Sequence, residues 1–317
     1  MKKIWLDSYP DYIPSELSKS EFNSISEIFE YASEKFSNLI AFNSLGSNLS
    51  FKKTALLANR FSAFLHNVLR IRKGDKVAVM LPNLLTFPVS FFGCLNIGII
   101  VVNVNPLFTS REIKSLLLDS SAETIVILDK FLDELEPILS ETKIKNVIVC
   151  RPYDLLNFPM GIILRTILFF KTKFNQISKD YILFGDIVRT NEKIQPVSIT
   201  KNDIAILQYT GGTTGKSKAA VLTHHNLVSN IAQLQLWVDN ILQEGKEIII
   251  TALPMYHIFS LTVNLLFFYK IGSKNILVAN PRDLKSFVKT LSKNKFTVIT
   301  AVNTLFNLLL TSSKFKK

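Results

Sequence analysis

Cysteine is scarce in this sequence, since only 2 of its 317 residues are Cys. Cys94 and Cys150 share no C-x-x-C spacing and lie in apolar stretches, which excludes a disulfide scaffold and a thioredoxin-type redox motif. We therefore expect buried, reduced thiols in a cytoplasmic protein. Glycine and proline are also few, with 11 of each against 24 Phe, which excludes collagen-like, linker-like and intrinsically disordered chains.

Acidic residues are outnumbered, because 37 Lys and Arg face 25 Asp and Glu, giving a formal net charge of +12. A compositional bias toward Lys, Ile and Asn explains most of this surplus. The sequence has no RNP-type run, zinc-finger spacing or basic heptad region, so nucleic acid is not an expected partner. An anionic ligand or an anionic membrane surface is compatible with the positive charge.

Long uncharged runs raise the question of transmembrane segments. No charged residue lies between Lys76 and Arg111, and a second uncharged window covers residues 248–269. Pro, Gly and Asn interrupt both windows, and β-branched runs alternate with helical pieces, which favours buried helices beside buried strands over spanning helices. No cleavable signal is expected, because acidic and proline residues follow the charged start before any apolar stretch.

Helical and strand-like patterns alternate along the first half of the chain. Amphipathic or apolar helices are predicted over residues 27–36, 50–69, 84–96, 111–119 and 131–139. Buried strands are predicted over residues 77–80, 99–102, 124–128 and 147–149. Strand–helix–strand repetition predicts an α/β fold with a doubly wound, mostly parallel sheet.

Residues 153–181 break this alternation with a basic, apolar segment. Leu, Ile and Phe side chains are set among Arg165, Lys171, Lys173 and Lys179. The segment is too short and interrupted to span a bilayer. It fits a helix lying in a membrane interface, and equally an apolar connector packed on the core.

A loop rich in Gly, Thr and Lys lies between two predicted strands. It reads Tyr209-Thr210-Gly211-Gly212-Thr213-Thr214-Gly215-Lys216-Ser217-Lys218. Glycines let backbone N–H groups approach an anion, hydroxyls donate hydrogen bonds and Lys supplies charge, so the loop is typical of a phosphate site. Gly215-Lys216-Ser217 imitates the end of a Walker A motif, but Thr210 stands where that motif needs its first Gly, and a strand rather than a helix is predicted over 219–223.

The segment from Tyr209 to Lys218 resembles the signature phosphate loop of the adenylate-forming (AMP-binding) enzymes. Further segments resemble the bacterial long-chain fatty-acid–CoA ligases, namely residues 1–6, 81–85, 101–107, 251–259, 280–283 and 301–306. The resemblance covers essentially the whole chain. It implies the N-terminal portion of the adenylate-forming fold, with doubly wound, mostly parallel sheets in two α/β subdomains and no C-terminal domain. We expect the first subdomain over residues 1–198, with the basic apolar insertion near 153–181, and an incomplete second subdomain over 199–317.

The resemblance also implies a two-step reaction. A fatty carboxylate attacks the α-phosphate of ATP to give acyl-AMP and pyrophosphate, and the CoA thiol then displaces AMP. ATP, Mg²⁺, CoA and a fatty acid are the implied ligands. Phosphate binding is implied for Tyr209, Thr210, Gly211, Gly212, Thr213, Thr214, Gly215, Lys216, Ser217 and Lys218. Thr213 and Lys218 would be catalytic, with Lys218 favoured over Lys216, and Thr213 or Thr214 would lie near Mg²⁺. Tyr256, His257 and Phe259 would border the acyl pocket, although core packing explains the two aromatic residues equally well. His224 and His225 are expected to be structural.

Two departures from the family pattern affect the expected activity. Ala219 stands where the family has Gly after the loop Lys, which would cost about 1 kcal/mol if that position needs a positive φ. The family's later Mg²⁺, ribose and catalytic-Lys segments would fall beyond residue 317. We therefore hypothesise a truncated or split ligase whose partner is a separately encoded C-terminal half. The alternative is a catalytically inactive remnant, or a membrane-associated module that binds nucleotide or fatty acid. The expected location is the cytoplasm, peripheral on the inner face of the cytoplasmic membrane.

Overall fold

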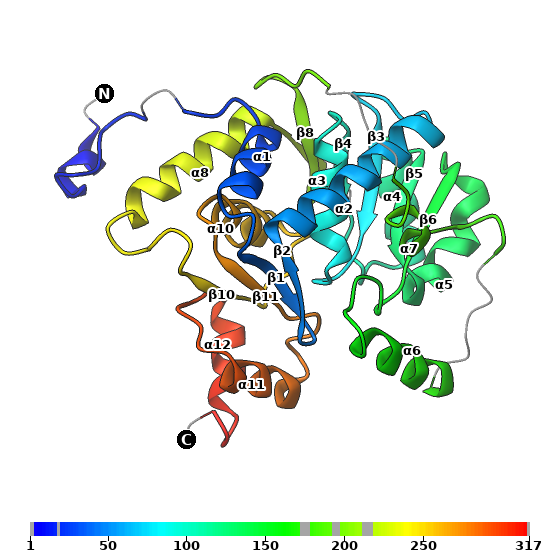
Figure 1. Cartoon of the computed structure of the whole chain (residues 1–317). Coiled ribbons are helices and arrows are strands. Elements are labelled where there is room, and N and C mark those ends of the chain that lie inside the picture. Colours follow the sequence, from blue (N-terminus) through cyan, green and yellow to red (C-terminus); the bar gives the residue numbers. More distant parts are fainter. Residues whose placement is uncertain (1–2, 18–19, 172–177, 192–196, 211–217, 316–317) are drawn as a thin grey trace.

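Two β-sheets organise the computed structural model, which describes residues 3–17, 20–171, 178–191, 197–210 and 218–315. The larger sheet has seven strands in the order β7-β6-β5-β3-β4-β8-β9, and the smaller has five in the order β12-β10-β11-β1-β2 (Figure 1). The larger sheet consists of β3 (Lys76–Met80), β4 (Ile100–Asn103), β5 (Thr124–Leu128), β6 (Asn146–Cys150), β7 (Ile182–Leu183), β8 (Ile204–Thr210) and β9 (Lys218–Thr223). The smaller consists of β1 (Ile40–Ser44), β2 (Ser47–Ser50), β10 (Ile248–Thr251), β11 (Lys274–Leu277) and β12 (Val298–Ile299).

Strand direction confirms the predicted doubly wound, mostly parallel architecture. Every neighbouring pair is parallel except β1–β2 and β8–β9, which are antiparallel. Both sheets combine strands from either side of residue 198, since β1 pairs with β11 and β4 pairs with β8. Strand pairing therefore crosses the predicted subdomain boundary at residues 198 and 199, and that boundary stays a prediction.

Helices cover the sheets and also lie between them (Figure 1). The α-helices are α1 (Ile25–Lys35), α2 (Phe51–Ala63), α3 (Thr86–Leu95), α4 (Ser110–Ser120), α5 (Leu132–Leu135), α6 (Met160–Lys171), α7 (Phe184–Ile187), α8 (His224–Val238), α9 (Ile258–Ser260), α10 (Phe268–Lys270), α11 (Leu284–Lys293) and α12 (Asn303–Leu310). The remaining helical segments are the 3-10 turns η1 (Ile4–Ser8), η3 (Asp129–Phe131) and η4 (Glu136–Glu141), and the π-helices η2 (Phe64–Val68) and η5 (Leu261–Phe267).

Two predicted helices differ from the structure in their second halves. The helix predicted over 50–69 is α-helical only to Ala63 and continues as η2. The helix predicted over 131–139 is a short α5 followed by η4, in which Pro137 occupies one of the first two positions. Proline lacks an N–H and cannot continue the α-helical ladder, which is why α5 ends there.

A single large apolar cluster joins the two sheets. It contains Phe42 of β1 and Leu277 of β11 on one side and Val77 of β3 and Ile148 of β6 on the other. At its centre the Tyr269 ring lies beside several Phe rings, and its buried hydroxyl pairs with the Ser33 hydroxyl at 2.9 Å. The rings within 6 Å of the Tyr269 centroid are Phe29, Phe42, Phe51 and Phe92.

The uncharged runs of the sequence are core segments. All of α3 is buried, and β4 beside it is buried along its whole length. Among the described residues, no helix has both the length and the apolar character needed to cross a membrane. Cys94 and Cys150 are free and buried, as expected, and burial raises the pKa of both thiols.

Candidate nucleotide and acyl-substrate site

The candidate site lies at the carboxyl ends of neighbouring parallel strands. Strands β3, β4 and β8 are parallel neighbours in the larger sheet and end at Met80, Asn103 and Thr210. The segment that follows β10 approaches this edge from the smaller sheet, because Asn83 binds it directly. Ligands of open α/β sheets bind at such carboxyl edges.

The predicted phosphate loop connects β8 to β9, and its two ends are described. Thr210 and Lys218 lie opposite each other in the β8–β9 ladder, and both are exposed. The predicted roles of Gly211, Gly212, Thr213, Thr214, Gly215, Lys216 and Ser217 lie outside the described residues. Strand β9 separates the loop from α8, as the sequence predicted, whereas a Walker loop runs directly into a helix.

Ala219 occupies an ordinary strand position. It pairs with Tyr209 across the β8–β9 ladder, and its φ is not positive. The sequence suggested a conformational cost of placing Ala where the family has Gly. Since φ at Ala219 is not positive, that cost does not arise here.

Tyr209 belongs to the core through its side chain. Its ring is 8% exposed and packs with the apolar cluster under α4, and its hydroxyl donates to Asp119 Oδ2 at 2.6 Å. Burial and the Asp119 carboxylate both raise the pKa of the phenol. The side chain thus has a packing role, and the predicted phosphate contact of Tyr209 stays a prediction that only its backbone can meet.

Gln208 connects the phosphate-loop strand to the predicted acyl segment, and sequence reasoning did not identify it. Its Nε2 donates to the backbone carbonyl of Tyr256 at 3.2 Å, and its Oε1 accepts from Asn103 Nδ2 at 3.0 Å. Gln208 is 5% exposed. The available signal was a lone amide inside an otherwise apolar strand, since buried polar groups need partners.

Asn83 is a second residue that the sequence did not single out. Its Nδ2 donates to the carbonyls of Thr251 and Leu253 at 3.0 and 2.9 Å, and its Oδ1 accepts from the N–H of Met255 at 2.9 Å. Asn83 is buried, as is Met255. One side chain after β3 thus fixes the backbone that follows β10, so the two sheets are held together at the edge that carries the loop.

Within residues 254–259, the predicted site residues Tyr256 and His257 differ in their exposure. Tyr256 is half-buried, and burial raises the pKa of its phenol while the charge of Arg282 opposes that rise. His257 is exposed and precedes α9, with its backbone N–H donating to Pro254 at 3.0 Å.

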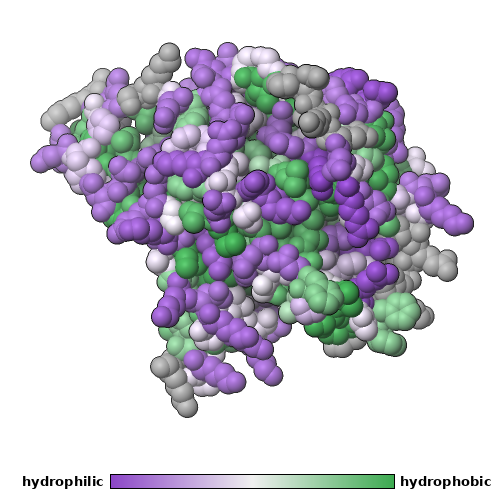
Figure 2. All heavy atoms as spheres, in the orientation of Figure 1, coloured by the Kyte–Doolittle hydropathy of each residue, from purple (hydrophilic) through white to green (hydrophobic). Residues whose placement is uncertain are grey.

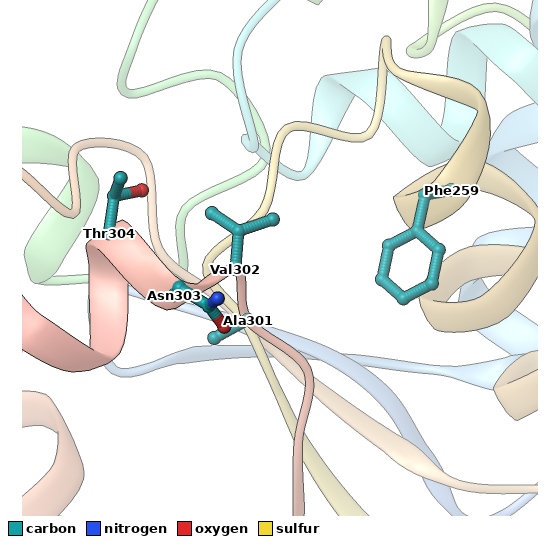
Figure 3. A pocket seen from close by; sticks show the side chains of 5 residues that line it. All are labelled: Phe259, Ala301, Val302, Asn303 and Thr304. Carbon is teal, nitrogen blue, oxygen red and sulfur yellow. The ribbon is translucent and has the colours of Figure 1, made fainter.

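Phe259 is the predicted acyl-pocket residue that lines a cavity. A hollow of about 550 Å³ is lined by Phe259 together with Ala301, Val302, Asn303 and Thr304. Figure 3 shows Phe259 on one wall and the other four residues on the facing segment at the start of α12. Tyr256 and His257 do not line this hollow, and their predicted acyl contacts stay predictions.

A buried polar network holds the two walls of this cavity together. On one side, Asn264 lies in the π-helix that continues the Phe259 helix, and its Oδ1 accepts from the Thr300 hydroxyl at 2.8 Å. Asn264 Nδ2 donates to the Thr251 hydroxyl at 3.3 Å, and that hydroxyl donates to Asn275 Oδ1 at 2.7 Å. Asn264 and Asn275 are both 0% exposed.

The two adjacent histidines occupy different environments. His224 is 0% exposed, and its Nδ1 accepts the N–H of Ile25 at 3.1 Å, while His225 is exposed. Burial lowers the pKa of His224 to about 4, so its ring is neutral near pH 7. Among the described residues, no group of three His, Cys, Asp or Glu side chains is placed to hold a metal ion. The Mg²⁺ position implied for Thr214 lies outside these residues.

Sequence comparison relates the chain to ligases of one family. Residues 29–317 match the AMP-binding enzyme family. The chain is 41% identical to the long-chain-fatty-acid–CoA ligase of Salmonella typhimurium, with 100% of this chain and 57% of that protein aligned. It is 30% identical to the long-chain-fatty-acid–CoA ligase of Bacillus subtilis, with 96% of this chain and 54% of that protein aligned. The chain therefore spans little more than half the length of these relatives.

Solved structures share the fold. The anthranilate CoA ligase AuaEII in complex with anthranoyl-AMP superposes with a TM-score of 0.77 at 22% identity, covering 94% of this chain and 53% of that chain. A long-chain-fatty-acid–CoA ligase (FadD1) from Archaeoglobus fulgidus gives 0.75 at 22% identity, covering 95% and 56%. These likenesses confirm the adenylate-forming fold that the sequence predicted.

Proposed function

This chain belongs to the family of AMP-binding enzymes, and on that premise we propose that it takes part in the ATP-dependent activation of long-chain fatty acids to acyl-CoA. A fatty carboxylate oxygen attacks the α-phosphorus of ATP, the bond to pyrophosphate breaks, and acyl-AMP forms. The CoA sulfur then attacks the acyl carbon, and AMP leaves. Fatty acid, ATP and CoA are the proposed substrates.

The observation that carries this proposal is the link between β8 and the segment after β10. The phosphate loop follows Thr210, and two residues earlier Gln208 binds the backbone of Tyr256. A loop suited to phosphate and a segment bordering a partly apolar hollow are therefore tied together by one side chain. In-line attack of a carboxylate on a phosphate requires the two groups to be held in fixed relation.

We assign different electrostatic roles to the loop residues. Thr210, Gly211, Gly212, Thr213, Thr214 and Gly215 would surround the β- and γ-phosphates with N–H and hydroxyl donors, as in other anion-binding loops. Lys218 would neutralise negative charge that develops on the phosphates. Its exposed ammonium stands at the end of the loop, opposite the exposed Thr210. Thr213 or Thr214 would help to hold Mg²⁺, which would supply positive charge against the phosphates when bound.

The substrate class rests on the hollow and on the names of the relatives. Phe259, Ala301 and Val302 supply an apolar lining, while Asn303 and Thr304 supply polar atoms. An alkyl chain suits the apolar part, because burial of methylene groups is favourable by about 0.8 kcal/mol each. The Salmonella typhimurium and Bacillus subtilis relatives are long-chain-fatty-acid–CoA ligases.

The aligned length bears on how the activity is completed. We include in the proposal a separately encoded C-terminal half that supplies the remaining part of the ATP site. The proposal also includes peripheral association with the inner face of the cytoplasmic membrane. Without that half, these 317 residues would bind substrate without turnover.

Fatty-acid-dependent exchange of pyrophosphate into ATP tests the proposal. The assay compares this chain alone with a fusion of the chain to the portion of the Salmonella typhimurium ligase beyond the aligned region. The fusion is expected to exchange with palmitate or oleate and not with benzoate, whereas the chain alone is expected to be inactive. A folded fusion that does not exchange with a fatty acid would refute the proposed function, and robust exchange by the chain alone would refute the need for a second half.

A further inference from the structure

The helix α6 exposes an unusual amount of apolar surface. Six of its large apolar residues are exposed, with fractions between 38% and 80%, and Phe158 just before it is 83% exposed. The six are Met160, Ile162, Ile163, Ile167, Phe169 and Phe170. Figure 1 shows α6 at the lower edge of the molecule, and Figure 2 shows hydrophobic side chains gathered there.

Helical spacing places these residues on one side of α6. Ile163, Ile167 and Phe170 are separated by four and three residues, which aligns them on one face, and Ile162 and Phe169 lie beside them. Leu164 faces the other way and is half-buried. The wider apolar face of α6 is therefore turned toward solvent and away from the core.

Close contacts hold α6 to the fold in this orientation. A Cβ at Gly161 would lie 3.1 Å from the backbone oxygen of Leu156, so the first turn packs tightly on the preceding segment. Leu156 in turn packs against the main core cluster. The backbone N–H of Asn157 donates to Ser47 Oγ at 3.0 Å, which ties the start of α6 to the β1–β2 hairpin.

The β1–β2 turn adds a further exposed apolar residue, Leu45, near this segment. Leu45 is 51% exposed and has a φ of 50°. A leucine at positive φ is uncommon because its Cβ is crowded there. Leu45 lies two residues from Ser47, which binds Asn157, so the turn lies next to the segment that leads into α6.

Charge identifies the partner of this edge. Between residues 155 and 179 the sequence has four basic residues, Arg165, Lys171, Lys173 and Lys179, and no acidic residue. Arg165 and Lys179 are exposed. Asp154 and Asp180 lie just outside this window, so the charge within it is positive throughout. An exposed apolar face that carries basic side chains is complementary to a bilayer surface that contains anionic lipid.

We propose that the outward face of α6, with Phe158 and Leu45, docks on an anionic lipid bilayer. The apolar side chains enter the boundary between headgroups and acyl chains, and Arg165 stays at the headgroup level. The inference rests on the membrane association included in the proposed function, and it assigns that association to residues. It would bring the chain to the surface in which long-chain fatty acids dissolve.

Vesicle co-sedimentation of the 317-residue chain tests this docking surface, with no nucleotide or fatty acid present. The vesicles are phosphatidylglycerol with phosphatidylethanolamine, and phosphatidylcholine alone is the comparison. Because ligase substrates are omitted, failure of the ligase assay leaves this test valid, and a negative result here leaves the ligase proposal standing.

The double variant Ile163→Gln/Phe170→Gln removes part of the apolar face. Its partition into anionic vesicles is expected to fall about tenfold or more relative to the unaltered chain. The matched control is Ile241→Gln/Leu118→Gln, since these residues are 73% and 43% exposed and lie outside α6. The control is expected to bind like the unaltered chain. Arg165→Gln is expected to lower binding to anionic vesicles about fivefold and to weaken its dependence on salt.

Three results would overturn the assignment. The first is failure of the unaltered chain to bind anionic vesicles. The second is equal vesicle binding by the double variant and the unaltered chain. The third is a dimer of the unaltered chain in sedimentation equilibrium that becomes a monomer in the double variant while vesicle binding is unchanged. The last result would assign the face to a second copy of this chain. Circular dichroism and thermal midpoints of all variants should match, because the substituted side chains are exposed.

Discussion

Met255 donates its backbone N–H to the side-chain oxygen of Asn83 at 2.9 Å. The same amide donates to the carbonyl of Thr251 at the end of β10 and to that of Leu253 just after it, so a residue that follows β3 of the larger sheet fixes the backbone at the end of a strand of the smaller sheet. The three bonds are buried or partly buried, which makes their loss costly.

Asn83→Ala is expected to lower the free energy of unfolding by about 2 to 4 kcal/mol, because it leaves buried backbone groups unpaired. Urea denaturation followed by circular dichroism measures the change. Asn230→Ala is the matched control, since Asn230 is exposed on α8, and it should shift stability by less than about 0.5 kcal/mol. Equal effects of the two substitutions would contradict the clamping role of Asn83.

The amide pair Asn103–Gln208 is expected to show a measurable coupling energy. A double-mutant cycle with Asn103→Ala and Gln208→Ala should give about 1 kcal/mol, because this hydrogen bond is buried. The exposed amide pair Asn43–Asn48, at 2.7 Å, is the control cycle and should give less than about 0.5 kcal/mol. Similar coupling in both pairs would show that burial of the Gln208 bond is unimportant.

His224 makes stability depend on pH. Its pKa is about 4 in the folded chain because burial lowers it, with Asp203 and Glu27 opposing and Lys73 reinforcing the shift. The unfolded chain binds its proton near pH 6.5. Between pH 6.5 and 4 the unfolded state holds more protons, so the free energy of unfolding contributed by this residue falls as pH falls, by up to about 3 kcal/mol.

His224→Asn removes that titration and keeps an acceptor for the Ile25 N–H. The difference in unfolding free energy between variant and unaltered chain, measured by urea denaturation at pH 7 and pH 4.5, should shift in favour of the variant at the lower pH. His225→Asn, at an exposed position, should show no such shift. A pH-independent difference for His224→Asn would mean that the buried ring does not titrate in this window.

Asp154 acts in the opposite direction. Burial raises its pKa to about 6, against the Arg151 backbone hydrogen bond and the charges of Arg151 and Arg189, with Asp129 adding to the rise. Between about pH 4 and 6 the folded state holds more protons, so stability from this residue falls as pH rises, by about 2 kcal/mol. Asp154→Asn should therefore gain on the unaltered chain from pH 4 to pH 6.5. A gain of the opposite sign in urea denaturation would contradict the raised pKa.

The sequence predicted the fold well where patterns are local and continuous. Strands such as Thr124–Leu128 and the fully buried α3 followed from apolar runs and their punctuation. Strand order was not predictable, because β1 pairs with β11 across more than two hundred residues and no local pattern records that pairing.

The candidate site was predictable only in part, for a similar reason. The loop ends Thr210 and Lys218 and the cavity residue Phe259 lie in segments that resemble a known family. Asn83 and Gln208 act through contacts with distant backbone, which composition and spacing do not reveal. Tyr209 is the opposite case, because it lies in the sequence motif but its side chain packs in the core.

Lys218→Ala tests the central claim most directly, namely that the loop between β8 and β9 binds phosphate for acyl-adenylate formation. In the fusion with the Salmonella typhimurium portion, it is expected to lower fatty-acid-dependent ATP–pyrophosphate exchange by about a hundredfold or more. Lys216→Ala should lower it far less, and Lys201→Ala, at an exposed position before β8, should leave it unchanged. Exchange by Lys218→Ala equal to that of the unaltered fusion would contradict the account.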